Sequence, residues 1–149
     1  MVFALTLAAA ILAKPVAVLA VSAGGDEWLG RLDDGERFGY SFLHSIYQAQ
    51  VEEELQREDG RMRTLRGSSP DIRAVEYFGW DARIVGSGGL YVQEAPAVDV
   101  PLLLIRVTAE GRQRLAAARW TLEMRARFGD ALLALRPTHR PLASLVIAR

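Results

Sequence analysis

The fold is decided by residues 37–55, which read RFGYSFLHSIYQAQVEEEL. This stretch contains two strand-like runs joined by a short connection. In the first run, Phe38, Tyr40, Phe42 and His44 occupy alternate positions. Alternate residues of a strand project from the same face, so the pattern predicts a strand whose buried face is aromatic and carries one histidine.

The second run places a carboxylate on the apolar face of the next strand. Val51, Glu53 and Leu55 alternate, so their side chains share one face, and the two glutamates that flank Glu53 point to solvent. A buried carboxylate needs a partner, because desolvation disfavours its charge. His44 on the adjoining strand is the nearest candidate, and the sequence therefore predicts a hydrogen-bonded His44–Glu53 pair.

The rest of the chain repeats this alternation of short strands and turns. Asp59-Gly60 is the strongest hairpin signal, because Asp-Gly readily takes positive backbone angles. Further strands are predicted over residues 72–78, 102–108 and 131–136, the second of them apolar enough to be covered on both faces. We expect a mainly β fold, an antiparallel sandwich or barrel-like single domain over residues 15–149.

Three segments near the C-terminus are less regular. Residues 120–128 alternate as a strand would, but their apolar residues also recur at four-residue spacing, so a strand and a short helix are both open. Two prolines predict that residues 137–141 break the preceding strand. Residues 142–148 are expected to form an edge strand or a frayed tail.

The first 23 residues are apolar except for Thr6, Lys14 and Ser22. Lys14-Pro15 divides them, so residues 1–14 are predicted to be a hydrophobic leader, either a signal peptide or a membrane anchor. This predicts a protein that is membrane-anchored or exported to the extracytoplasmic face. The alternative is a buried core helix of a cytoplasmic protein.

Composition excludes some classes of function. The 18 basic and 18 acidic residues cancel, which argues against a general nucleic-acid binder. The chain has no cysteine, so it has neither disulfides nor thiolate ligands. The glycines of residues 86–89 lack the spacing of a phosphate-binding loop, and no cofactor is expected.

Two chemical roles for the central residues compete with a structural or binding role. Ser45 as nucleophile, His44 as base and Glu53 as orienting acid would make a hydrolase, but no nucleophile elbow frames the serine, and adjacent strand residues face opposite sides. A metal site on His44 and Glu53 would need a further ligand, and the candidates lack diagnostic spacing. These candidates are His139, Asp81, Glu76 and Glu94.

The remaining interpretation involves no chemistry. A His44–Glu53 pair would fix two strands in register and line a small pocket with Tyr40, Tyr47 or Trp80, where it would recognise a ligand or a partner. Alternatively, the pair only stabilises the core. Ser45 would then end its strand through a hydrogen bond to nearby backbone.

The same residues carry a family resemblance. The pattern His-Ser-Ile at residues 44–46, followed by Val51 and Glu53, resembles a small bacterial and archaeal family of unknown function. The resemblance extends over about residues 16–108, with the Tyr-Phe-Gly-Trp segment at 77–80 as the counterpart of the Gly-containing segment of that family. Many members have a Gly-Ala-Gly cluster where this chain reads Gly79-Trp80-Asp81.

Members of that family are typically encoded beside TAXI-type TRAP transporters, which import organic anions with an extracytoplasmic solute-binding protein. The resemblance thus implies a non-enzymatic accessory module. Its partner would be the membrane subunit of the transporter or the solute-binding protein, and its central residues would be His44, Ser45 and Glu53.

Overall fold

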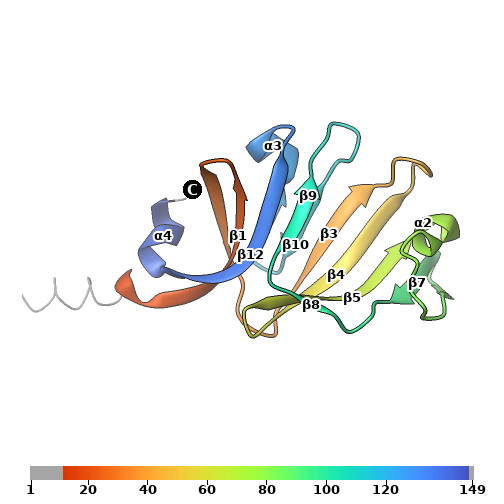
Figure 1. The fold of residues 1–149 in the computed structure, drawn as a ribbon, viewed down its shortest axis with the longest axis horizontal. Helices are drawn as coiled ribbons and strands as arrows, with labels where there is room; N and C mark the ends of the chain where they lie inside the picture. The colour runs from red at the N-terminus through yellow and green to blue at the C-terminus, as the bar shows by residue number, and fades with distance from the viewer. Residues whose placement is uncertain (1–11, 148–149) are drawn as a thin grey trace, which may run out of the picture.

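The protein folds as an antiparallel β-sandwich, as the sequence predicts (Figure 1). The computed structural model describes residues 12–147, so the leader predicted over residues 1–14 lies largely outside the described residues. Two antiparallel sheets face each other, and Figure 1 shows the helices α2 and α4 at opposite ends of the molecule.

The smaller sheet has four strands in the order β2-β1-β12-β9. These strands are β1 (Pro15–Ala23), β2 (Asp26–Arg31), β9 (Leu103–Arg106) and β12 (Leu132–Pro141). The larger sheet has eight strands in the order β11-β10-β3-β4-β5-β7-β6, with β8 paired beside β5. These strands are β3 (Arg37–Leu43), β4 (Gln50–Glu58), β5 (Arg61–Ser69), β6 (Val85–Ser87), β7 (Leu90–Glu94), β8 (Asp99–Val100), β10 (Arg114–Ala117) and β11 (Trp120–Glu123).

The pairing of β3 with β4 shows which residues share each face of the larger sheet. Phe38 pairs with Leu55, and both side chains belong to the core between the sheets. The face that carries Phe38 and Leu55 is termed the inner face, and the opposite one the outer face. The Asp59-Gly60 hairpin that joins β4 to β5 forms as predicted, with both residues at positive φ.

Two tryptophans close one side of the sandwich. The rings of Trp28 on β2 and Trp120 on β11 meet edge to face with centroids 5.0 Å apart, and the Trp120 indole N–H donates to the Arg31 carbonyl over 2.7 Å. Gly30 makes this contact possible, because a Cβ there would lie 2.5 Å from Trp28 and 2.7 Å from Trp120. The two sheets are therefore linked where β2 approaches β11.

A buried arginine near the end of β4, which the sequence pattern did not single out, links the two sheets. Arg57 continues the inner-face alternation of β4 and is 0% exposed. Its guanidinium donates to Asp34 over 2.8 Å and to the carbonyls of Val18 and Thr138 over 2.8 and 3.0 Å. Because those carbonyls belong to β1 and β12, Arg57 satisfies polar groups of the opposite sheet from inside the core.

The strand predicted over residues 72–78 is wrong. The chain forms the helix α2 (Ile72–Glu76) there, and the Asp71 side chain caps it by accepting from the Arg73 backbone N–H over 3.0 Å. The β-branched residues of this segment favoured a strand, but the cap and the burial of Ala74 and Val75 against the sheet favour a helix.

The break predicted over residues 137–141 is also wrong, because β12 continues to Pro141 and pairs with β1 over residues 134–141. Its other neighbour, β9, pairs only with residues 132–135, so Pro137 needs no partner on that side. The predicted burial of residues 102–108 on both faces is wrong too, since β9 is an edge strand and Leu104 is 56% exposed.

Of the two remaining C-terminal predictions, one agrees with the structure and the other does not. Residues 120–128 combine both alternatives, because β11 (Trp120–Glu123) leads directly into the helix α3 (Met124–Phe128). The edge strand or tail expected over residues 142–148 is wrong for residues 142–147, and residue 148 lies outside the described residues. The helix α4 (Leu142–Ile147) forms there and begins with a hydrogen bond from the Leu142 N–H to the Lys14 carbonyl.

Candidate functional site

The predicted His44–Glu53 pair is wrong in the observed register. Glu53 lies opposite Tyr40, whereas the N–H of His44 donates to the carbonyl of Ala49, beyond the end of the β3–β4 ladder. His44 follows Tyr40 by four residues, so along the strand direction it lies about 13 Å from the position of Glu53. Both side chains lie on the inner face, but each has its own surroundings.

His44 organises the turn that follows β3. The imidazole is buried, and its Nδ1 accepts the backbone N–H groups of Ile46 and Tyr47 over 3.3 and 3.5 Å. These contacts use the Nδ1 lone pair as the acceptor, which places the ring N–H at Nε2. Histidine thus performs the local backbone-capping role that Asp or Ser often has in turns.

Aromatic and basic side chains surround this imidazole. The rings of Tyr47 and Tyr77 lie with centroids 4.9 and 4.8 Å from that of His44, and the Arg73 guanidinium lies over Tyr47 at 5.0 Å. Ile46 and Tyr77 are 63% and 64% exposed. Ile46, Tyr47, Arg73 and Tyr77 are termed the His44 patch.

Ser45, His44 and Glu53 do not form a triad. Ser45 is exposed in the turn, and the Nδ1 of His44 is occupied by backbone N–H groups instead of an acid. Glu53 is too distant to orient the imidazole. For the metal-binding alternative, residues 12–147 contain no cluster of three or more His, Asp or Glu side chains.

Glu53 is a half-buried carboxyl beside the ring of Tyr40. Desolvation raises the pKa of Glu53 to about 7, so this side chain takes up a proton near neutrality. Burial, and then the charge of Glu53, raise the pKa of Tyr40 above its ordinary value. Glu53 is therefore a carboxyl that is partly protonated near neutrality and stands next to a phenol, in place of the hydrogen-bonded pair with histidine that the sequence predicted.

Trp80 belongs to a separate aromatic stack. Its ring lies parallel to that of Phe78 with centroids 4.3 Å apart, and Phe78 covers Gly67 on β5, where a Cβ would lie 2.2 Å from the ring. The Gln93 amide donates to the carbonyls of Trp80 and Ala82 over 2.7 Å each. Trp80 is therefore held as part of the packing of the α2 segment and does not line a pocket with His44.

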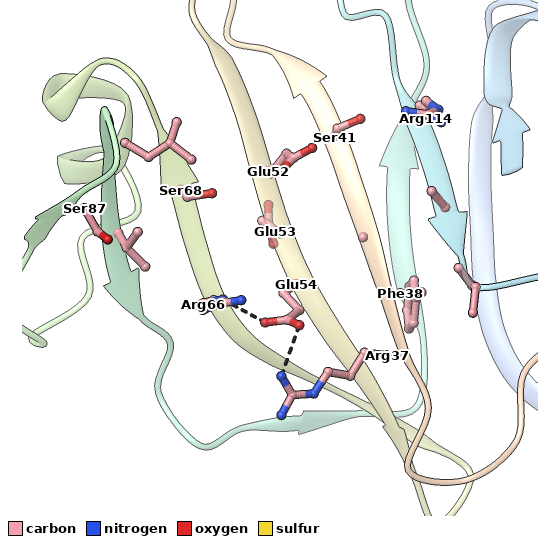
Figure 2. Close-up of a pocket in the computed structure, with 16 residues that line it drawn as sticks. Arg37, Phe38, Ser41, Glu52, Glu53, Glu54, Arg66, Ser68, Ser87 and Arg114 are labelled. Carbon is pink, nitrogen blue, oxygen red and sulfur yellow. Dashed lines mark hydrogen bonds and ion pairs between the residues drawn. The ribbon is translucent and has the colours of Figure 1, made fainter.

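The outer face of the larger sheet carries a groove of about 550 Å³, which the sequence pattern did not reveal (Figure 2). Its floor is low because β3 and β10 present only the small residues Gly39, Ser41 and Ala116 there. Longer side chains rise around this floor. They include Arg37, Glu52, Glu54, Arg66, Leu90 and Arg114.

Glu54 lies between two arginines at one end of this groove. Its carboxylate accepts from Arg37 over 3.2 Å and from Arg66 over 2.7 Å, as the dashed lines of Figure 2 show. Glu52 makes no ion pair within residues 12–147. The sequence assigned Glu52 and Glu54 only to a solvated face, because alternation does not show which strands flank β4.

Comparisons of the chain with protein-family models, with curated proteins and with solved structures find no match. Within residues 12–147, none of the helices has the length and hydropathy that crossing a bilayer would require.

Proposed function

We propose that this protein is a non-enzymatic accessory module that binds another protein through the His44 patch. The supporting observation is the exposure of Ile46 and Tyr77 beside a buried histidine. His44 fixes the turn that carries Ile46, and its ring contacts that of Tyr77 at the end of α2. Tyrosine and arginine are enriched in the centres of protein interfaces, and a fixed turn presents them at a low entropic cost.

The partner we propose is a TAXI-type TRAP transporter for organic anions, through its membrane subunit or its solute-binding protein. The support for this partner is the resemblance of residues 44–46 and Glu53 to the transporter-linked family. The module would be anchored or exported to the extracytoplasmic face by its hydrophobic N-terminus. The inner-face polar residues would then serve docking indirectly, by holding β3, β4 and the turn in place.

Affinity capture of the tagged full chain from detergent-extracted membranes tests this proposal. We expect recovery of transporter subunits, and we expect Tyr77→Ser or Ile46→Ser to lower that recovery by roughly ten-fold or more, as the loss of an interface hot spot does. The matched control is Leu104→Ser, which removes a similarly exposed side chain from β9, on the other sheet.

Ser45→Ala should leave the recovery unchanged, because the proposal gives the hydroxyl no chemical role. Recovery of the protein alone, from the soluble fraction, would contradict both the membrane assignment and the partner. Equal recovery of transporter subunits with Tyr77→Ser and with Leu104→Ser would be consistent with the proposed partner but would show that the His44 patch is not its docking surface.

A further inference from the structure

The outer-face groove has opposite charges at two positions along β4. Arg37 and Arg66 share the single carboxylate of Glu54, so this end keeps one positive charge and several unused guanidinium N–H donors. Two residues earlier on the same face, Glu52 is exposed and makes no ion pair within residues 12–147. Alternate residues of a strand are about 7 Å apart, which sets the spacing of the two charges.

Hydroxyl groups flank the negative position. Ser41 on β3 and Ser68 on β5 are the cross-strand neighbours of Glu52, so all three side chains stand in one row on the outer face. Neither hydroxyl makes a side-chain hydrogen bond to another group of residues 12–147. A carboxylate with hydroxyl acceptors on both sides suits a primary ammonium group, which has three N–H donors to place.

The wall and size of the groove suit a short aliphatic chain between the two charges. Leu90 and Val92 stand on one side, with Ala116 and Ala118 on the other. The volume of about 550 Å³ lies within the range of roughly 300–1,000 Å³ that small-molecule sites occupy. A ligand that only carried a carboxylate would leave Glu52 unpaired, and an amine alone would leave the two arginines without an added acceptor.

From these features we infer that the groove binds a small linear zwitterion, whose carboxylate contacts Arg37 and Arg66 and whose ammonium group contacts Glu52. An ω-amino acid with four methylene groups and a dipeptide both have the required charge spacing. This site lies on the face of the sheet opposite His44 and does not depend on the docking proposed above.

Two other charged groups border the site. Arg114, at the far side of Ser41, is paired with Glu123 over 3.1 Å and adds no net charge. Glu94 on β7 is the cross-strand neighbour of Arg66 and lines the adjoining hollow, where it weakens the positive potential of the arginines without pairing with them. Removing the charge of Glu94 should therefore strengthen binding, whereas removing that of Glu52 should weaken it.

A titration of the isotope-labelled full chain, followed by NMR chemical shifts, tests the inference. The probes are 5-aminovalerate, valerate and pentylamine, which share a five-carbon chain and differ only in their charged ends. We expect 5-aminovalerate to bind with a Kd on the order of 1 mM and to shift the amides of Ser41, Glu52 and Ser68. Valerate and pentylamine should each bind roughly three- to ten-fold more weakly, as the loss of one exposed ion pair implies.

Two carboxylate-to-amide variants give the sharper test. Glu52→Gln should weaken the binding of 5-aminovalerate by about three- to ten-fold without weakening that of valerate. Glu94→Gln should tighten the binding of both carboxylate probes. Both residues are exposed, so unchanged thermal unfolding is the expected folding control. Equal affinity for the three probes, shifts confined to other surfaces, or effects of the same sign in the two variants would each overturn the inference. A parallel titration with glycylglycine distinguishes a peptide ligand from a free ω-amino acid.

Discussion

Glu53 and Glu54 are neighbours on β4, and the two faces of the sheet give them opposite surroundings. Glu53 stands on the inner face beside Tyr40, where desolvation raises its pKa to about 7. Glu54 stands on the outer face and accepts from two exposed arginines. One residue of strand thus separates a carboxyl that takes up a proton near neutrality from a carboxylate held in an ion-pair network.

The contrast extends to the whole sheet. Polar groups of the inner face, such as Arg57 and His44, are buried and each has a fixed set of hydrogen-bond partners. The arginines of the outer face are exposed and Glu54 between them is half-buried, so solvent screens their pairing, which contributes little to stability and leaves guanidinium N–H donors to meet a ligand. We therefore expect inner-face substitutions to change folding and outer-face substitutions to change binding.

The largest expected effect is at Arg57. Arg57→Ala should lower the free energy of unfolding by about 3–5 kcal/mol, because it leaves two buried carbonyls and Asp34 without their donor and opens a cavity. Urea unfolding followed by tryptophan fluorescence measures it. The outer-face counterpart, Arg66→Ala, should cost less than about 1 kcal/mol. Equal losses for the two arginines would remove the distinction between the faces.

The next effect is the pH dependence due to Glu53. Its native pKa of about 7 exceeds the ordinary value of 4.5, so between these values the native state holds a proton that the unfolded state has released. The contribution of Glu53 to the free energy of unfolding should accordingly be greatest below about pH 4.5. It should fall by on the order of 2–3 kcal/mol as the pH rises to 7. Urea unfolding across this range should show the slope in the wild type.

Glu53→Gln should flatten that part of the profile, since the amide does not ionise. Glu54→Gln is the matched control, and it should leave the slope in place. If the free energy of unfolding of the wild type rose from pH 4.5 to 7, and Glu53→Gln removed that rise, the assignment of a desolvated carboxyl would be contradicted.

Alanine substitutions at two glycines, one on each face of the larger sheet, probe how closely each face is packed. Gly67→Ala places a Cβ 2.2 Å from the Phe78 ring, so Phe78 must shift, at a cost of about 1–3 kcal/mol. Gly39→Ala meets nothing closer than 4.0 Å on the outer face and should be neutral or stabilise by about 0.5–1 kcal/mol. Thermal unfolding of both variants measures the difference, and a larger loss at Gly39 would be incompatible with an open groove there.

The smallest expected effect is the coupling between Arg66 and Glu54. A double-mutant cycle with alanine at both positions should give an interaction free energy below about 1 kcal/mol, which falls further in 1 M salt. A salt-independent coupling of several kcal/mol would show that the outer-face network is as structural as Arg57.

The class of fold could be predicted from local patterns because alternation and turn residues act over few positions. Residues 37–58 and the Asp59-Gly60 hairpin follow those patterns closely. Prediction failed where distant strands decide the outcome. Pro137 is tolerated inside β12 because β9 pairs only with the residues before it. Residues 72–76 become a helix because Ala74 and Val75 are buried where α2 contacts β5 and β7, in addition to the local cap by Asp71.

The candidate sites were predictable only in part. Alternation identified the inner-face positions of His44 and Glu53, but the pairing register separates them, and their partners are the turn backbone and Tyr40. The groove could not be found from the sequence, because its residues come from β3, β4, β5, β6, β7 and β10 and their adjacency follows from the strand order alone.

What the sequence by itself determined is which side chains share a face of each strand, since the two-residue period of a strand is a local property of the backbone. That period alone puts Glu53 and Glu54 on opposite faces of β4. Only the tertiary structure decided what each face meets. Sheet order and register arise from long-range pairing, and these place Tyr40 beside Glu53, two arginines beside Glu54 and Arg57 between the sheets.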